Sequence, residues 1–139
     1  MKKFFSTAIN LSFLHFWLLI LRVGVSGLML THGYPKLLRL LDGNMQFGDP
    51  LGIGAGVSFV LAVFAEAICS VLIILGLGTR LASIPLIITM ATAAFIVHAN
   101  DPFGKQEVPI LYLLIYVTLL IVGAGKYSLD QGIGKKGKK

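Results

Sequence analysis

Charged residues and cysteines are both scarce in this chain of 139 residues. Only 13% of the residues are charged, whereas about 25% is typical of soluble domains. The single cysteine, Cys69, lies in an apolar run. No disulfide or dithiol pair can therefore form within one chain, and we interpret Cys69 as a small buried hydrophobic side chain.

Several enzyme signatures are missing as well. The sequence contains no phosphate-binding glycine loop, no nucleophile triad, no metal-ligand cluster and no Cys-x-x-Cys pair. We therefore expect no metal site, and we expect a protein that is not an autonomous enzyme.

Apolar residues are abundant, and they are grouped. The mean hydropathy is +0.87, and four apolar segments occupy residues 11–30, 56–77, 81–98 and 108–125. Each is close to the ~20 residues that a helix needs to cross a bilayer. None alternates polar and apolar residues as a membrane barrel strand does. The sequence predicts an all-α integral membrane protein built as a bundle of four transmembrane helices.

The remaining residues fall into loops and a tail. Residues 31–55 read as a long polar loop and residues 99–107 as a shorter one, both rich in glycine, proline and charge. We expect one domain over residues 1–131, followed by a basic, flexible, cytoplasmic tail over residues 132–139.

The distribution of charge predicts the orientation in the membrane. One side of the predicted bundle would hold Lys2, Lys3, Arg80, Lys126, Asp130, Lys135, Lys136, Lys138 and Lys139. The other side would hold Lys36, Arg39, Asp42, Asp49, Asp101, Lys105 and Glu107. Because cytoplasmic loops carry the excess of basic residues, both termini are expected in the cytoplasm and the two longer loops outside it. The net charge of +6 is thus explained by membrane orientation, and no nucleic acid partner is expected.

Two charged residues, Arg22 and Glu66, lie inside predicted spans, where each costs about 2.5–3.5 kcal/mol at the helix centre. Each is 11 residues from the cytoplasmic end of its segment, which corresponds to a depth of about 17 Å. Equal depth on neighbouring antiparallel helices predicts a direct ion pair.

Three interpretations of Arg22 and Glu66 remain open. The preferred one is structural, a pair that locks the first helix to the second. The functional alternative is a proton relay or a polar anchor for the headgroup of a ligand. In the third, the two charges have other partners, for example across a subunit interface.

A second polar cluster is expected at the exterior face. Its members come from the ends of the predicted helices and the adjoining loops: His32, Tyr34, Lys36, His98, Asp101 and Glu107. We expect them to form a rim of hydrogen bonds or a shallow exterior pocket. Two histidines could also ligate a metal or a haem, which is the less favoured interpretation because their spacing matches no motif.

The order of several short motifs resembles the DoxX family from about residue 18 to residue 131. The matching positions are Arg22, His32-Gly33, Lys36, Gly48-Asp49-Pro50, Glu66, Gly76, Thr79-Arg80, Met90-Ala91 and the segment 125–130. Members of this family are small four-helix membrane proteins of bacteria. The name comes from a subunit of an archaeal quinone-linked oxidase complex that oxidises thiosulfate, and some bacterial members are linked to redox defence.

The resemblance implies a protein of the bacterial inner membrane that anchors or assists a quinone-linked redox system. No cofactor is assigned by the sequence, and a quinone is the candidate that the resemblance offers. The partners would be the lipid bilayer together with a second copy of the chain or another membrane or periplasmic protein. Two other functions stay open: a non-enzymatic scaffold or assembly factor, and a small transporter or lipid-binding oligomer.

Overall fold

The computed structural model describes residues 7–136, with side chains described as far as residue 134. Every regular element in this part of the chain is a helix, and it contains no strand. In chain order the elements are α1 (Leu11–Leu41), α2 (Ala55–Val63), η2 (Phe64–Cys69), α3 (Ser70–Leu75), α4 (Thr79–Thr92), η3 (Ala93–Val97), α5 (Phe103–Val122) and α6 (Leu129–Lys136).

Within residues 7–136, four continuous helical stretches are long and apolar enough to cross a membrane: Leu11–Leu41, Ala55–Leu75, Thr79–Val97 and Phe103–Val122. The prediction of an all-α chain with four membrane-spanning helices is confirmed. Two boundaries are corrected. The first helix ends at Leu41, so residues 31–41 are helical and not part of a loop. The last span begins at Phe103 and not at residue 108.

The extension of α1 has a clear cause. Residues 36–41 carry leucines at four of six positions, broken only by Lys36 and Arg39. Such a segment is amphipathic, and one face can pack against a neighbour while the long basic side chains reach toward water. Pro35 lies inside the helix without ending it, as is common for proline in membrane-spanning helices.

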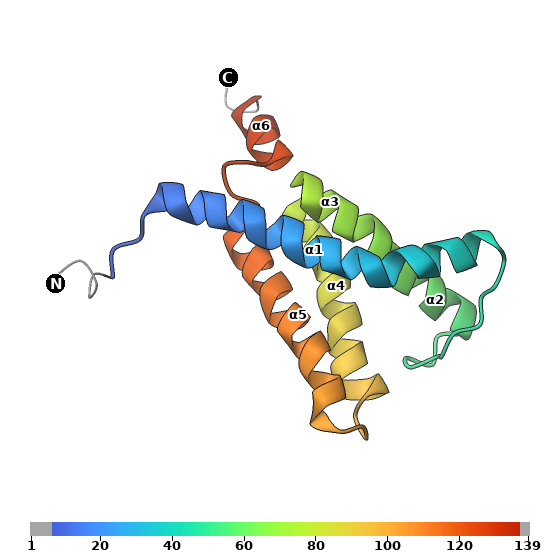
Figure 1. Ribbon diagram of the computed structural model, residues 1–139. Helices are drawn as coiled ribbons and strands as arrows, with labels where there is room; N and C mark the ends of the chain where they lie inside the picture. The colour runs from blue at the N-terminus through green and yellow to red at the C-terminus, as the bar shows by residue number, and fades with distance from the viewer. Residues whose placement is uncertain (1–6, 137–139) are drawn as a thin grey trace.

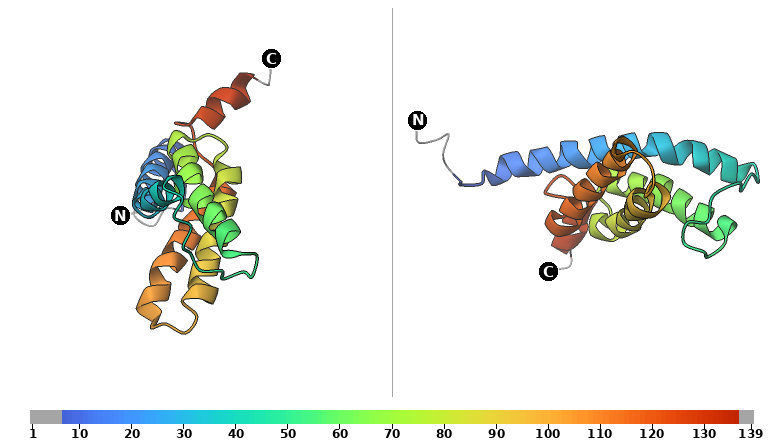
Figure 2. Two further views of the ribbon diagram at one scale, coloured as in Figure 1. Left: turned by 90° about the vertical axis from the view of Figure 1, so that its right-hand side faces the viewer. Right: turned by 90° about the horizontal axis from the view of Figure 1, so that it is seen from below.

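The helices pack as two layers that cross. The α2–η2–α3 stretch runs back alongside α1, and α4 pairs with α5 in a hairpin that crosses α1 at a steep angle (Figures 1 and 2). The N-terminal part of α1 extends beyond the bundle, and α6 projects from one end (Figure 1). Residues 132–136 of the expected tail thus belong to α6, while residues 137–139 lie outside the described residues.

The core is narrow and lies where the two layers meet. Its largest fully buried apolar side chains are Met29, Phe59, Ile73, Leu86, Tyr116 and Leu119. Large apolar side chains also cover the outer faces of all four spans, with Phe13 68% and Leu114 59% exposed. An exposed apolar surface of this extent is stable in lipid and would aggregate in water.

One close approach sets the register between α1 and η2. A Cβ atom on Gly33 would lie 2.4 Å from the backbone carbonyl carbon of Glu66. Because glycine has no side chain, the backbones of α1 and η2 can touch at Gly33, as small residues allow in membrane helices. Lys36, one turn beyond Gly33, is thereby placed next to Glu66.

Candidate functional site

A pocket of about 460 Å³ lies between the α2–η2 stretch and the α4–η3 stretch. Its lining is mainly apolar and includes Leu61, Ala62, Phe64, Pro85, Ile88, Ala93 and Val97. The loop that follows α1 contributes Phe47, Pro50, Leu51 and Ile53. A pocket of this size and composition, with few polar groups, is typical of a site for a small apolar ligand.

Lys36 and Glu66 form the charged part of the lining. The Nζ atom of Lys36 lies 2.6 Å from each carboxylate oxygen of Glu66. The side chain of Glu66 is only 4% exposed, whereas that of Lys36 is 27% exposed. The ammonium also lies 5.8 Å from the centroid of the Phe47 ring, a cation–π distance. The pair therefore places a hydrogen-bond donor, Lys36, and a hydrogen-bond acceptor, Glu66, side by side in an apolar pocket.

The expected ion pair between Arg22 and Glu66 is wrong. Arg22 donates from Nη1 to the carbonyl oxygens of Ile73 at 2.9 Å and Ile74 at 2.6 Å, and from Nη2 to that of Tyr127. Equal depth requires that the N-terminal end of α1 and the C-terminal end of α3 lie at the same level, but the N-terminal part of α1 extends beyond the bundle (Figure 1). The Gly33 contact shifts α1 so that Lys36, and not Arg22, lies beside Glu66.

Arg22 is instead stabilised by the end of a helix. The carbonyls of Ile73 and Ile74 belong to the last turn of α3, where carbonyl groups lack partners within the helix and the helix dipole is negative. Arg22 is 2% exposed. A buried guanidinium with several donors suits this position, because it satisfies carbonyls from two segments at once.

Two π-helical segments border the pocket. Glu66 lies in η2, and η3 contributes Ala93 and Val97 immediately before His98. A π turn contains an extra residue relative to an α turn, which rotates the side chains that follow, and such turns are frequent at functional sites. Here η2 carries Glu66 and η3 leads directly into His98, and both residues line the same pocket.

Two members of the expected exterior cluster, Lys36 and His98, line the pocket. His98 is held by a neighbouring carboxylate. Its Nδ1 atom lies 2.7 Å from Oδ2 of Asp101, and Lys105 lies 3.7 Å from the other carboxylate oxygen. The hydrogen bond from His98 and the charge of Lys105 hold the pKa of Asp101 below its usual value. In the neutral ring, the Nδ1 atom that faces the carboxylate carries the proton, which leaves Nε2 as an acceptor.

The other expected members do not line this pocket. The ring of His32 packs edge-on to Tyr112, with centroids 6.5 Å apart. Tyr34 is 58% exposed, and Glu107 is exposed in the first turns of α5. The structure thus divides the expected cluster: Lys36 and His98 lie at the pocket, Asp101 supports His98, and His32, Tyr34 and Glu107 lie elsewhere. Among residues 7–136 no three His, Cys, Asp or Glu side chains gather closely enough to hold a metal ion.

Sequence reasoning missed the role of Asp49. Its carboxylate accepts hydrogen bonds from the backbone of Ile53 at 3.0 Å and Gly54 at 2.9 Å, and from the hydroxyl of Ser58 at 3.0 Å. These bonds, the one from Gly54 foremost, lower the pKa of Asp49. They fix the loop that lines the pocket to the start of α2. The signal was the turn sequence Gly48-Asp49-Pro50, which marks an Asp that bonds its own backbone.

Comparisons with known proteins agree with the fold. The DoxX family model matches residues 17–99. An uncharacterized protein of Haemophilus influenzae is 33% identical over 132 residues, which covers 87% of this chain and 93% of the relative. The inner membrane protein YphA of Escherichia coli is 31% identical over 124 residues, covering 82% and 88%. An uncharacterized membrane protein of Mycobacterium tuberculosis is 29% identical over 125 residues, covering 72% and 77%.

No solved structure matches the chain. The matched family model spans more than half of the sequence, and relatives align along most of their own length. The chain is therefore an integral membrane protein that belongs to the DoxX family.

Proposed function

We propose that this protein is an accessory subunit of a quinone-linked redox system in the bacterial inner membrane, and that the pocket beside Lys36 and Glu66 holds the quinone headgroup. The observation that carries the proposal is the chemistry of the lining. An apolar pocket within membrane-spanning helices contains one charged pair, with its acid almost fully buried. Ionisable groups are costly inside membrane-spanning segments and mark functional sites there.

The donor set fits a quinone. A quinone presents a flat ring, carbonyl oxygens that accept hydrogen bonds, and a long apolar tail. The ammonium of Lys36 has three N–H donors for such an oxygen, of which Glu66 accepts two. The free Nε2 atom of His98 can accept from a hydroxyl of the reduced form. The apolar side chains of η2 and η3 would then contact the ring and the start of the tail.

The accessory role rests on what the chain itself provides. Its one cysteine is buried and cannot form an intramolecular dithiol. A subunit of this kind would hold or exchange a quinone for a partner enzyme that supplies the rest of the reaction. Its homo-oligomeric or hetero-oligomeric contacts would use the exposed apolar faces of the spans.

The test is to measure quinone that copurifies with the protein. Wild type and two variants are purified in a mild detergent, extracted with organic solvent, and analysed for quinone per mole of protein. Ala93→Phe fills the pocket without touching a charge, and Ile96→Phe places the same phenyl side chain at a 49% exposed position of η3 outside the lining. Quinone should remain in wild type and Ile96→Phe and fall at least about tenfold in Ala93→Phe. Wild type without quinone but with a stable protein partner would instead favour a scaffold.

A further inference from the structure

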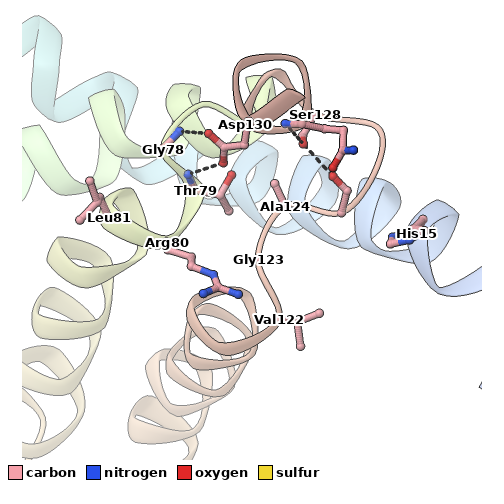
Figure 3. A pocket seen from close by; sticks show the side chains of 13 residues that line it. His15, Gly78, Thr79, Arg80, Leu81, Val122, Gly123, Ala124, Ser128 and Asp130 are labelled. Atoms are coloured by element: carbon pink, nitrogen blue, oxygen red, sulfur yellow. Dashed lines mark hydrogen bonds between the residues drawn. The ribbon is translucent and has the colours of Figure 1, made fainter. Parts of the chain in front are cut away.

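A second pocket, of about 710 Å³, lies at the other end of the bundle (Figure 3). It is formed by α1 near His15, by the start of α4, by the end of α5 and by the segment that leads into α6. Thr79 begins one membrane span and Val122 ends another, so the pocket lies at the level where spans emerge from the apolar layer. It shares no lining residue with the pocket at Lys36 and Glu66.

The one carboxylate in the lining is already engaged. Oδ1 of Asp130 accepts from the backbone N–H of Gly78 at 2.6 Å, and Oδ2 accepts from that of Thr79 at 3.0 Å (Figure 3). Asp130 thus caps the N-terminus of α4, where a negative charge is stabilised by the helix dipole. Its two oxygens therefore face backbone amides and not the cationic side chain or the hydroxyls of the lining.

Among the described residues, Arg80 is the cation that lines this pocket. It donates from Nη2 to the carbonyl of Ile121 at 3.1 Å, and its guanidinium points toward the end of α5 beside Gly123 (Figure 3). No carboxylate in residues 7–136 pairs with it. Its remaining N–H groups can therefore bind an anion from the pocket, and a guanidinium matches phosphate oxygens in geometry.

Two further donors line the same pocket. The hydroxyl of Thr79 is fully buried and has no hydrogen-bond partner in the described part of the chain, which is costly unless a ligand or water supplies one. The Nδ1 atom of His15 accepts from the backbone N–H of Lys126 at 3.3 Å. The proton of the neutral ring is then on Nε2, which becomes a donor.

We infer that this pocket binds a phosphate group through Arg80 and the Thr79 hydroxyl. A guanidinium and a buried hydroxyl are both donors, and the one acid that lines the pocket among the described residues faces backbone amides. The exposed side chains of Leu81 (75%) and Val122 (43%) border the pocket and could contact acyl chains. The phosphate therefore comes either from an anionic lipid headgroup or from a soluble phosphate ester, which present the same chemistry.

The experiment is native mass spectrometry of the full chain released from mild detergent, after incubation with phosphatidylglycerol, with phosphatidylcholine, or with inorganic phosphate. Arg80→Gln should lower the bound fraction at least about tenfold, the loss expected for one charge-assisted hydrogen bond. Arg39→Gln is the matched control, because Arg39 bonds the Gln46 carbonyl at the opposite end of the bundle.

Thr79→Val keeps the proposal testable if Arg80→Gln does not fold. This change removes a hydroxyl that has no protein partner and should leave the ligand-free melting temperature unchanged or raise it, while lowering phosphate binding. Selective retention of phosphatidylglycerol, lost in Arg80→Gln and Thr79→Val but kept in Arg39→Gln, identifies a lipid site. Binding of inorganic phosphate with the same pattern and no lipid selectivity identifies a soluble ester. Equal binding by all variants, or none by wild type, overturns the inference.

Discussion

Arg22 occupies the space that a side chain on Gly76 would need. A Cβ atom on Gly76 would lie 2.5 Å from Nη1 of Arg22 and 2.6 Å from Cβ of Ser128. Gly76 ends α3 in the left-handed conformation, at φ +69°, and its carbonyl accepts from the backbone N–H of Asp130 at 2.8 Å. One buried guanidinium and one glycine thus join α1, the end of α3 and the C-terminal segment.

The first prediction follows from this contact. Gly76→Ala should lower stability by about 2–4 kcal/mol, because it adds overpacking against Arg22 to the cost of a left-handed alanine. Gly78→Ala is the control, since Gly78 is also left-handed, at φ +59°, but has open space where its Cβ would be. It should cost only about 1–2 kcal/mol. Thermal unfolding in a mild detergent measures both, and equal losses would show that Arg22 does not fill that space rigidly.

The second prediction concerns the contact between α1 and η2. Gly33→Ala would place a methyl group 2.4 Å from the backbone of Glu66, and because backbone atoms cannot move aside cheaply, the two helices must separate. We expect a marked loss of stability together with loss of the Lys36–Glu66 pair. Gly27→Ala, on the same helix with nothing within 4 Å, should be neutral or stabilising by about 0.5–1 kcal/mol. Thermal unfolding of the two variants gives the comparison, and a Gly33→Ala protein as stable as Gly27→Ala would contradict the close approach.

The number and identity of the spans were predictable because lipid imposes a length and a polarity on each helix. The far end of α1 was not, because Pro35, Lys36 and Arg39 resemble loop residues in a sequence read alone. That error carried over to the site. A first helix that ends near residue 30 puts Lys36 at the exterior rim, and a count of residues from the helix ends pairs Arg22 with Glu66. The Gly33 contact instead pairs Lys36 with Glu66.

The polar pocket at the other end was hidden for a different reason. Its walls are joined where Asp130 caps α4 and where the backbone N–H of Lys126 donates to His15. Both contacts join residues far apart in the chain. No local pattern predicts such a contact. The motifs that carry the family resemblance, including Gly76, Thr79-Arg80 and residues 125–130, nevertheless meet there.

The third prediction separates the two members of the charged pair. Lys36→Met leaves the carboxylate of Glu66 buried and unpaired, whereas Glu66→Gln leaves an ammonium that can still reach water. Lys36→Met should therefore be the more destabilising of the two. We expect it to lower the free energy of unfolding by about 3 kcal/mol relative to wild type, the low end for a broken buried pair, because Lys36 is partly exposed. The double variant Lys36→Met/Glu66→Leu should recover most of that loss. Unfolding of the three variants measures the coupling, and a double variant less stable than both singles would contradict it.

The fourth prediction concerns orientation, for which the charge distribution favours both termini in the cytoplasm. In a Cys69→Ala background, a cysteine is introduced in the loop after α1 (Met45→Cys) or in α6 (Ile133→Cys). Both positions are exposed, at 48% and 60%. A membrane-impermeant maleimide applied to intact spheroplasts should label Met45→Cys, and should label Ile133→Cys only after lysis. The reverse pattern would invert the topology.

The central claim is that the Lys36–Glu66 pocket binds a quinone headgroup. The most direct measurement is the melting temperature of the purified protein at increasing concentrations of a short-chain quinone. Wild type is compared with Lys36→Met/Glu66→Leu, which leaves no lone buried charge at the pair. We expect saturable stabilisation of wild type and at least about tenfold weaker binding by the double variant. Equal stabilisation of both proteins, or no saturable effect on wild type, would contradict it.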